Sequence, residues 1–443
     1  MESLKEKLKN IISDYPQLKI QLYLKNWQTD FLRFYKSQTN YNISKNSVTL
    51  YVSIYKDKKN YSFEISNPSE EQVRLQIEEA LIYIDKLPPD PYFIDLENDL
   101  RRIDEKQKDN NIENISLNRK IEILKHFAEA VKPYDFDIYG TFICNNETNW
   151  ILNSNGLDKV SKVSPYYFEV KAVSNKNEVT VLESFGSDNA SALDTEMILS
   201  NLIVKIKAAQ NEIVDVEAGD YEVILAPRCI GDFLSMYAWS NLFISSIDRK
   251  NTELDGKVGE KVFPECFSLY DNPRHPNTVN YDYSHDGHLY QNLPIFEKGI
   301  FKNFLVNNYY AHKLNVPENG NEANCLVMET GNHSLEDMIK GIKKGLYISS
   351  FHYMNFINSR ETSLTGLTRD GTFLIEDGKI TKVINNLRFT EKITDVINNI
   401  QEIENKASTF PMSDNYGNFS IYTYSMPHIK VKEFNISSST KTV

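Results

Sequence analysis

Cysteine is scarce in this sequence. Its 443 residues include four cysteines, Cys144, Cys229, Cys266 and Cys325, and no two of them form a Cys-x-x-Cys pair. Such wide spacing argues against a disulfide framework and against a zinc knuckle. We therefore expect free thiols, which are typical of a reducing compartment.

Long apolar stretches are also missing. The sequence has no run of about 18 apolar residues, the length that a membrane-spanning helix needs. The first 15 residues carry charges throughout and lack the apolar core of a signal peptide. Hydrophobic residues make up 41% and charged residues 25%, as in ordinary globular proteins. We expect a cytoplasmic protein that has no membrane partner.

Positive charge is in deficit. The chain has 49 Lys and Arg against 61 Asp and Glu, which gives a net charge of −12. Binding to a phosphate backbone requires clustered Lys and Arg side chains. We therefore expect no nucleic-acid partner.

The usual catalytic motifs are absent as well. None of the eight histidines is followed by Glu, which excludes the His-Glu signatures of zinc peptidases. The sequence also lacks the G-x-S-x-G turn of serine hydrolases, the phosphate-binding G-x-x-x-x-G-K-[ST] loop and the dinucleotide-binding G-x-G-x-x-G loop. Motif searching thus yields no catalytic and no cofactor-binding residue.

What remains is a regular alternation of helix and strand patterns, which predicts an α+β fold. In residues 1–90, helical spacing is followed by alternating strand patterns at residues 18–24, 30–35, 48–55 and 61–65. A second helix then runs to about Lys86, and we place its N-cap at Asn67, with Glu70 completing a capping box. This pattern predicts a small helix-strands-helix domain.

Two further units follow. The polar segment 104–111 reads as a linker, and residues 105–212 repeat the order of helix, strands and helix. The strands of this unit are expected at residues 138–144, 150–153, 166–173 and 179–185, and its closing helix at residues 194–210 should be well buried. Residues 218–443 contain short, turn-punctuated strands, so we predict a large β-rich C-terminal domain.

One stretch connects this pattern to a known family. Residues 219–240 read as a strand, a turn through Pro227 and a helix with Phe233 and Tyr237 on its apolar side. This layout resembles the start of the catalytic domain in the TldD/PmbA family of zinc metallopeptidases. An N-S-x-G turn at Asn153, earlier in the chain, is also similar to the family. Further similar segments follow the helix in the same order as in the family, at residues 256–263, 286–287, 297–305, 345–348 and 371–380.

The resemblance also shows that the residues of the zinc motif are missing from this sequence. In TldD chains the helix carries His-Glu-x-x-x-His, in which the two His bind zinc and the Glu activates water. The matching positions here are Ser235, Met236 and Ser240. A hydroxyl is a poor zinc ligand, and a thioether cannot exchange a proton at neutral pH. The third ligand of TldD chains is a Cys near the segment that is residues 363–368 here, but no cysteine follows Cys325.

By resemblance, the chain therefore falls in the PmbA-like branch, which lacks the zinc motif. This implies a non-catalytic subunit of a heterodimer that cleaves unfolded or extended peptides. A TldD-like partner subunit would supply the zinc, and this chain would hold no catalytic, cofactor-binding or metal residue. Members of the family have also been labelled modulators of DNA gyrase, a label that the charge of this chain does not support.

Two alternatives stay open. The loop that contains His285, Asp286 and His288 could hold a divalent metal, which would make the chain a self-standing metallopeptidase with a relocated site. Adjacent polar residues before a glycine more often form an exposed turn, and that is our expectation here. The second alternative is a non-enzymatic, self-associating peptide-binding protein, such as a homodimer.

Overall fold

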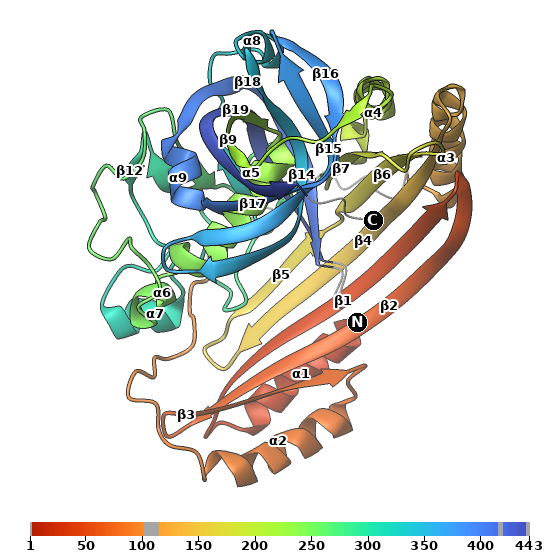
Figure 1. The fold of residues 1–443 in the computed structure, drawn as a ribbon. Coiled ribbons are helices and arrows are strands. Elements are labelled where there is room, and N and C mark those ends of the chain that lie inside the picture. Colours follow the sequence, from red (N-terminus) through yellow and green to blue (C-terminus); the bar gives the residue numbers. More distant parts are fainter. Residues whose placement is uncertain (1, 102–114, 415–419, 440–443) are drawn as a thin grey trace.

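The computed structural model describes residues 2–101, 115–414 and 420–439. The predicted linker at residues 104–111 lies outside the described residues. Two β-sheets with helices packed against them make up the described chain (Figure 1). The predicted α+β class, with a large β-rich C-terminal part, is confirmed.

The first sheet has seven strands in the order β3-β2-β1-β4-β6-β7, and β5 also pairs with β4. All of its pairings are antiparallel. The strands are β1 (Lys19–Tyr35), β2 (Gln38–Lys56), β3 (Lys59–Ser66), β4 (Phe136–Asn153), β5 (Asp158–Val163), β6 (Tyr166–Ser174) and β7 (Thr180–Ser187). Because β1 pairs with β4, strands from residues 1–90 and from residues 105–212 share this sheet. The proposed boundary between these two units stays a prediction.

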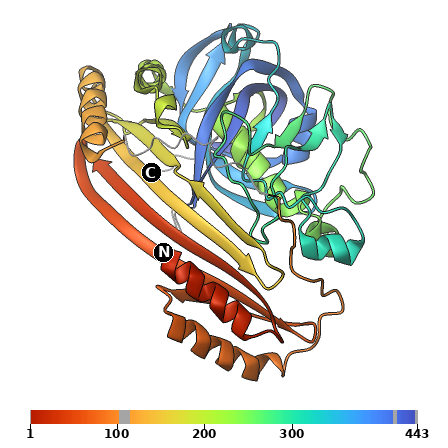
Figure 2. The ribbon, with the colours of Figure 1, turned by 180° about the vertical axis from the view of Figure 1, so that it is seen from behind.

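Two helices cover one face of the sheet at the end formed by β1, β2 and β3. They are α1 (Glu2–Asp14) and α2 (Glu70–Ile84), which lie together in the view of Figure 2. Leu8 and Ile11 of α1 and Val73 and Ile77 of α2 are fully buried in a common core with β1 and β2. This core holds the N-terminal part together.

The predicted N-cap of α2 is wrong. Ser69 caps the helix, and its side chain forms a reciprocal capping box with Gln72. Asn67 instead has a left-handed backbone, with φ of 49°, a conformation that Asn tolerates better than most residues. The turn that leads into the helix therefore uses Asn67, and the cap lies two residues later.

Two more helices, α3 (Leu117–Val131) and α4 (Thr195–Ala209), pack at the other end of the first sheet. On α4, Ile198, Leu202 and Ile206 are buried, but Met197 is 46% and Val204 64% exposed. The expectation that this helix is buried over much of its surface is thus correct for one face only.

The second sheet has twelve strands and contains a closed ring. Its main order is β12-β11-β10-β13-β19-β9-β14-β15-β16-β8, with β17 bridging β15 and β19, and with β18 paired to β19. Successive pairing of β19, β9, β14, β15 and β17 returns to β19 and so closes the ring. The strands are β8 (Ile213–Val214), β9 (Gly219–Leu225), β10 (Leu269–Asp271), β11 (Leu293–Glu297), β12 (Ile300–Phe301), β13 (Leu326–Met328), β14 (Lys344–Asn358), β15 (Ser363–Glu376), β16 (Lys379–Ile384), β17 (Leu387–Lys392), β18 (Ile400–Asp414) and β19 (Ser420–Ser439).

The helices of this part are short. They are α5 (Pro227–Tyr237), α6 (Ser245–Asp248), α7 (Asn308–Leu314), α8 (Leu335–Lys340) and α9 (Ile393–Asn398). Among the described helices, none combines the length and the apolar character that a bilayer crossing requires.

Candidate functional site

The helix α5 follows β9 as the sequence predicts. Its residue Phe233 fixes it against the ring of strands, because the aromatic ring lies 4.6 Å from that of Phe351 on β14 and 5.9 Å from that of Phe389 on β17. Gly231 allows the other side to pack closely, since an added Cβ would lie 1.7 Å from Phe410 Cζ. Ser235 and Met236, two of the positions that correspond to the zinc motif, therefore lie on a helix that packs closely against the ring of strands.

These positions offer nothing that binds zinc. Ser235 lies near the Tyr424 hydroxyl, which itself donates a hydrogen bond to the Ala323 carbonyl at 3.0 Å. Beyond the end of α5 the chain makes a π-helical turn, Ala238–Leu242, in which Ser240 Oγ donates a hydrogen bond to the Met236 carbonyl at 2.9 Å. Asn241 Nδ2 in turn donates to Ser240 Oγ at 2.7 Å. The Ser240 hydroxyl is thus engaged with the protein.

Met236 and Ser240 line a cavity of about 540 Å³. None of the described residues that line it is a His, Cys, Asp or Glu, and one of them is the cationic Arg249. Zinc in proteins needs imidazole, thiolate or carboxylate ligands, and a guanidinium beside it would repel the ion. The family's zinc ion does not fit here. The segment at residues 363–368, where the resemblance places the third ligand, forms the start of β15.

The loop with His285, Asp286 and His288 does not form the ligand set that its sequence suggested. His285 Nδ1 lies 3.2 Å from Glu322 Oε1, whereas His288 Nδ1 lies 3.1 Å from Glu97 Oε2. Asp286 lines a separate cavity of about 90 Å³ that also borders Glu97. The prediction that these residues are exposed in a turn is confirmed for the His285 side chain, which is 63% exposed. It is wrong for His288, which is buried.

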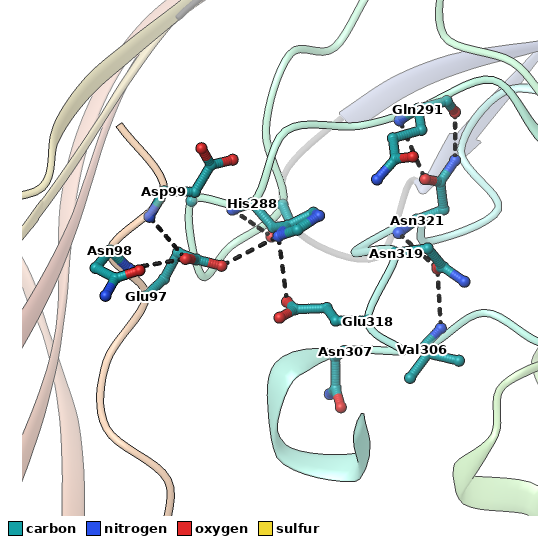
Figure 3. Close-up of polar contacts among 12 residues, drawn as sticks. Glu97, Asn98, Asp99, His288, Gln291, Val306, Asn307, Glu318, Asn319 and Asn321 are labelled. Atoms are coloured by element: carbon teal, nitrogen blue, oxygen red, sulfur yellow. Dashed lines mark hydrogen bonds and ion pairs between the residues drawn. The ribbon is translucent and has the colours of Figure 1, made fainter. Parts of the chain in front are cut away.

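His288 instead belongs to a three-residue cluster that the sequence did not reveal. Glu97, His288 and Glu318 each offer a ligand atom, and these atoms lie within 4.8 Å of one another (Figure 3). Among the described residues this is the one group of His, Cys, Asp and Glu side chains with metal-binding spacing. The three residues come from the segment after α2, from the loop before β11 and from the loop after α7.

Electrostatics couple the three groups. The hydrogen bond from His288 lowers the pKa of Glu97 and outweighs burial, which raises it. Burial raises the pKa of Glu318 to about 7. Burial alone would lower the pKa of His288, but the hydrogen bond to Glu97 and the charge of Glu318 outweigh it and raise this pKa. The cluster therefore stabilises positive charge at the imidazole.

The N-S-x-G turn between β4 and β5 holds the segment that carries Glu97. Asn153 Nδ2 donates to the Glu97 carbonyl at 2.7 Å, and Asn155 Nδ2 donates to the Leu96 carbonyl at 2.8 Å. The turn that the sequence indicates at Asn153 is confirmed, and it joins the antiparallel strands β4 and β5. Its side chains also have a positioning role that the sequence pattern did not indicate.

A second polar feature lies between β1, β4 and the C-terminal loops. It is a cavity of about 190 Å³ lined by Tyr23, Lys25, Trp27, Glu147, Asn149, Tyr281, Tyr283, His285, Tyr290, Glu322, Asn324, Ser420 and Tyr422. Glu147 is 2% exposed, and its Oε2 has no hydrogen-bond partner. Burial raises the pKa of Glu147 to about 8 and lowers the pKa of Lys25. This cavity can offer a neutral carboxyl group among aromatic rings.

Comparison with known proteins identifies the family. Residues 110–213 match the PmbA/TldA metallopeptidase central domain, and residues 218–438 match the PmbA/TldA metallopeptidase C-terminal domain. A zinc metalloprotease TldD homolog of Saccharolobus solfataricus is 25% identical over 269 residues, which are 55% of this chain and 57% of that protein. The chain thus matches little more than half of this relative's length.

Solved structures share the fold. TldE from Thermococcus kodakarensis superposes with a TM-score of 0.85 at 20% identity, over 98% of this chain and 100% of that one. A protein of Thermotoga maritima described as a candidate modulator of a DNA gyrase gives a TM-score of 0.83 at 18% identity, over 98% and 100% of the two chains. Two matched domains that together span most of the sequence show that the chain belongs to the TldD/PmbA metallopeptidase family.

Proposed function

We propose that this chain is a PmbA-like, non-catalytic subunit that pairs with a TldD-like subunit in a zinc peptidase. One observation carries the proposal: at the positions of the TldD zinc motif, α5 and the π-helical turn after it present Ser235, Met236 and Ser240. The cavity beside them has no metal-binding side chain among its described lining residues. The partner would then supply both the zinc and the water-activating Glu.

An apolar surface beside this cavity supports the pairing. Trp239, Tyr353 and Ile357 are 68%, 75% and 61% exposed. The ring of Trp239 stacks on that of Phe356 at 6.1 Å, and both side chains line the cavity. Tyr353 and Ile357 belong to the same strand as Phe356, β14. Exposed apolar side chains beside a cavity are typical of protein contact sites. We assign this surface to the TldD-like partner.

The substrate of such a complex would be an unfolded or extended peptide. Sheets bind extended peptides by adding them as a further strand, and the second sheet of this chain has short edge strands, β8 and β12. In this proposal the chain helps to enclose the peptide, and the partner cuts it. The four free cysteines agree with a reducing compartment such as the cytoplasm.

Reconstitution tests the proposal. The chain is purified alone, mixed with the TldD-like chain encoded in the same genome, and assayed on an unfolded peptide with and without zinc. We expect a mixed complex in size-exclusion chromatography and zinc-dependent cleavage by the mixture, but no cleavage by this chain alone. Zinc-dependent cleavage by the isolated chain would refute the proposal. Exclusive formation of homodimers, with no binding to the TldD-like chain, would instead support the self-associating peptide-binding protein.

The other alternative, a catalytic metal held by His285 and His288, loses its ligand pair. The two imidazoles face different carboxylates, Glu322 and Glu97. Replacing the two histidines one at a time therefore tests each position separately.

A further inference from the structure

We propose that Glu97, His288 and Glu318 form a structural site for one divalent transition-metal cation of the zinc type. The site joins the segment after α2 to two C-terminal loops. It is separate from the proposed function, since its residues do not line the cavity beside α5 and it assigns no catalysis to this chain.

The distances fit such a cation. Two ligands that are each about 2.1 Å from a tetrahedral zinc ion lie about 3.4 Å apart. Here, His288 Nδ1 lies 3.1 Å from Glu97 Oε2 and 3.5 Å from Glu318 Oε1. All three ligand atoms lie within 4.8 Å of one another, so small side-chain adjustments bring them around a common centre.

Hydrogen bonding alone leaves the cluster incomplete. The Nδ1 atom of His288 carries at most one proton, and its hydrogen bond goes to Glu97. Glu318 Oε1 points at the same nitrogen, yet it is buried without a hydrogen-bond partner, and so is His288 Nε2. Leaving a carboxyl oxygen buried without a hydrogen-bond partner costs free energy. A cation between the three atoms would bind both carboxylates at once.

The surrounding residues hold the ligands in place, as the outer contacts of metal sites do. Glu97 Oε1 accepts hydrogen bonds from the backbone N–H groups of Asn98 and Asp99, both at 2.7 Å, which leaves Oε2 facing His288. The His288 N–H donates to Ser284 Oγ at 3.1 Å. Gly320, whose φ is +68°, makes room for the imidazole, because an added Cβ would lie 2.6 Å from His288 Cδ2.

The donor set decides which cation is bound. One imidazole nitrogen and two carboxylate oxygens suit zinc and neighbouring transition metals. Calcium and magnesium prefer ligand sets made only of oxygen. A transition metal such as zinc is therefore expected, with water completing its coordination.

Metal binding by the isolated full chain tests this inference. The protein is stripped with a chelator and desalted, zinc is added, and unbound metal is removed before the bound metal is measured. We expect one zinc per chain and a rise in the melting temperature on adding zinc, because an ion that binds only the folded state stabilises it. Cobalt in place of zinc should give the visible absorption of a site with an imidazole ligand.

Separate histidine variants provide the matched control. H288A should lose the zinc and the rise in melting temperature, whereas H285A, three residues away in the same loop, should keep both. E318Q gives a second test should H288A fail to fold, because Glu318 lies on a partly exposed loop, and it should weaken zinc binding at least tenfold. Equal zinc content in wild type, H288A and E318Q would overturn the proposal. Stabilisation by calcium or magnesium but not by zinc would overturn it too.

Discussion

At the scale of single residues, burial decides the charge of several carboxyl groups. Glu147 on β4 accepts one hydrogen bond, from Asn145 Nδ2 at 3.1 Å, and is otherwise surrounded by the polar and aromatic lining of the cavity between the sheets. Its pKa of about 8 means that the folded chain keeps a proton at neutral pH. Glu391 is similar, because burial raises its pKa to about 7.

The pH dependence of stability follows from Glu147. Between the ordinary Glu value of about 4.3 and the folded value of about 8, the folded state holds a proton that the unfolded state releases. The stabilisation from this proton is fully present below the ordinary Glu pKa. As pH rises from there to the folded pKa, the free energy of unfolding falls by at most about 1.4 kcal/mol per pH unit. E147Q should remove this pH dependence. Urea unfolding should therefore show a smaller loss of stability between pH 6 and pH 8.5 for the variant than for wild type.

The exposed Glu71 on α2 offers the matched control. E71Q should follow wild type across the same pH range. Parallel losses of stability in wild type and E147Q would show that Glu147 is ionised in the folded chain.

At the scale of elements, local capping sets where α2 begins. Ser69 accepts a hydrogen bond from the Gln72 backbone N–H at 3.2 Å, and the Gln72 side chain accepts one from the Ser69 backbone N–H at 3.0 Å. Replacing an N-cap serine by alanine costs about 1 kcal/mol. S69A should therefore lower the free energy of unfolding by about that amount in urea denaturation.

A variant at Asn67 separates this cap from the one that the sequence suggested. N67G should cost little or add stability, because glycine adopts the left-handed backbone of this position without strain. A larger loss in N67G than in S69A would mean that Asn67 is the cap.

The long strands show where sequence patterns are insufficient. The sequence predicts two short strands at residues 18–24 and 30–35, whereas β1 runs unbroken from Lys19 to Tyr35. The polar residues in between interrupt the alternation of apolar side chains. The strand nevertheless continues, because β2 and β4 pair with it on both sides along its middle. Tertiary pairing of this kind overrides a local pattern.

The cluster around His288 could not be predicted for a related reason. His288 stands out in sequence, but Glu97 is 191 residues away and carries no signal of its own. By contrast, the strand and helix around Pro227 and the turn after Asn153 were predictable, because their signals are local. A site whose residues come from three separate segments is visible only in the fold.

At the scale of the whole molecule, the loop at residues 282–288 joins the two sheets. Lys159 on β5 donates to the Gly287 carbonyl at 2.8 Å, and its ammonium lies 4.6 Å from the centre of the Tyr283 ring. Ser161 on the same strand donates to Asp282 at 3.1 Å. These contacts are buried, so they fix the N-terminal sheet against the C-terminal part.

Removing the Lys159 ammonium should loosen this junction. K159M leaves the Gly287 carbonyl without its buried donor, which costs about 1–3 kcal/mol. We expect faster hydrogen exchange in residues 282–288 and lower stability in urea. K125M, at an exposed position of α3, should leave both unchanged. Equal exchange in K159M and wild type would show that the loop is held by other contacts.

The central claim is that peptide cleavage needs a partner's zinc site and not one in this chain. The most direct measurement is zinc-dependent peptidase activity of the reconstituted complex with one subunit altered at a time. Replacing the motif Glu of the TldD-like partner by Gln should abolish cleavage, whereas S235A and M236L in this chain should leave it within about twofold of wild type, less than about 0.4 kcal/mol in barrier height. Loss of cleavage in S235A and M236L with the complex intact, or cleavage that survives the partner's change, would contradict the account.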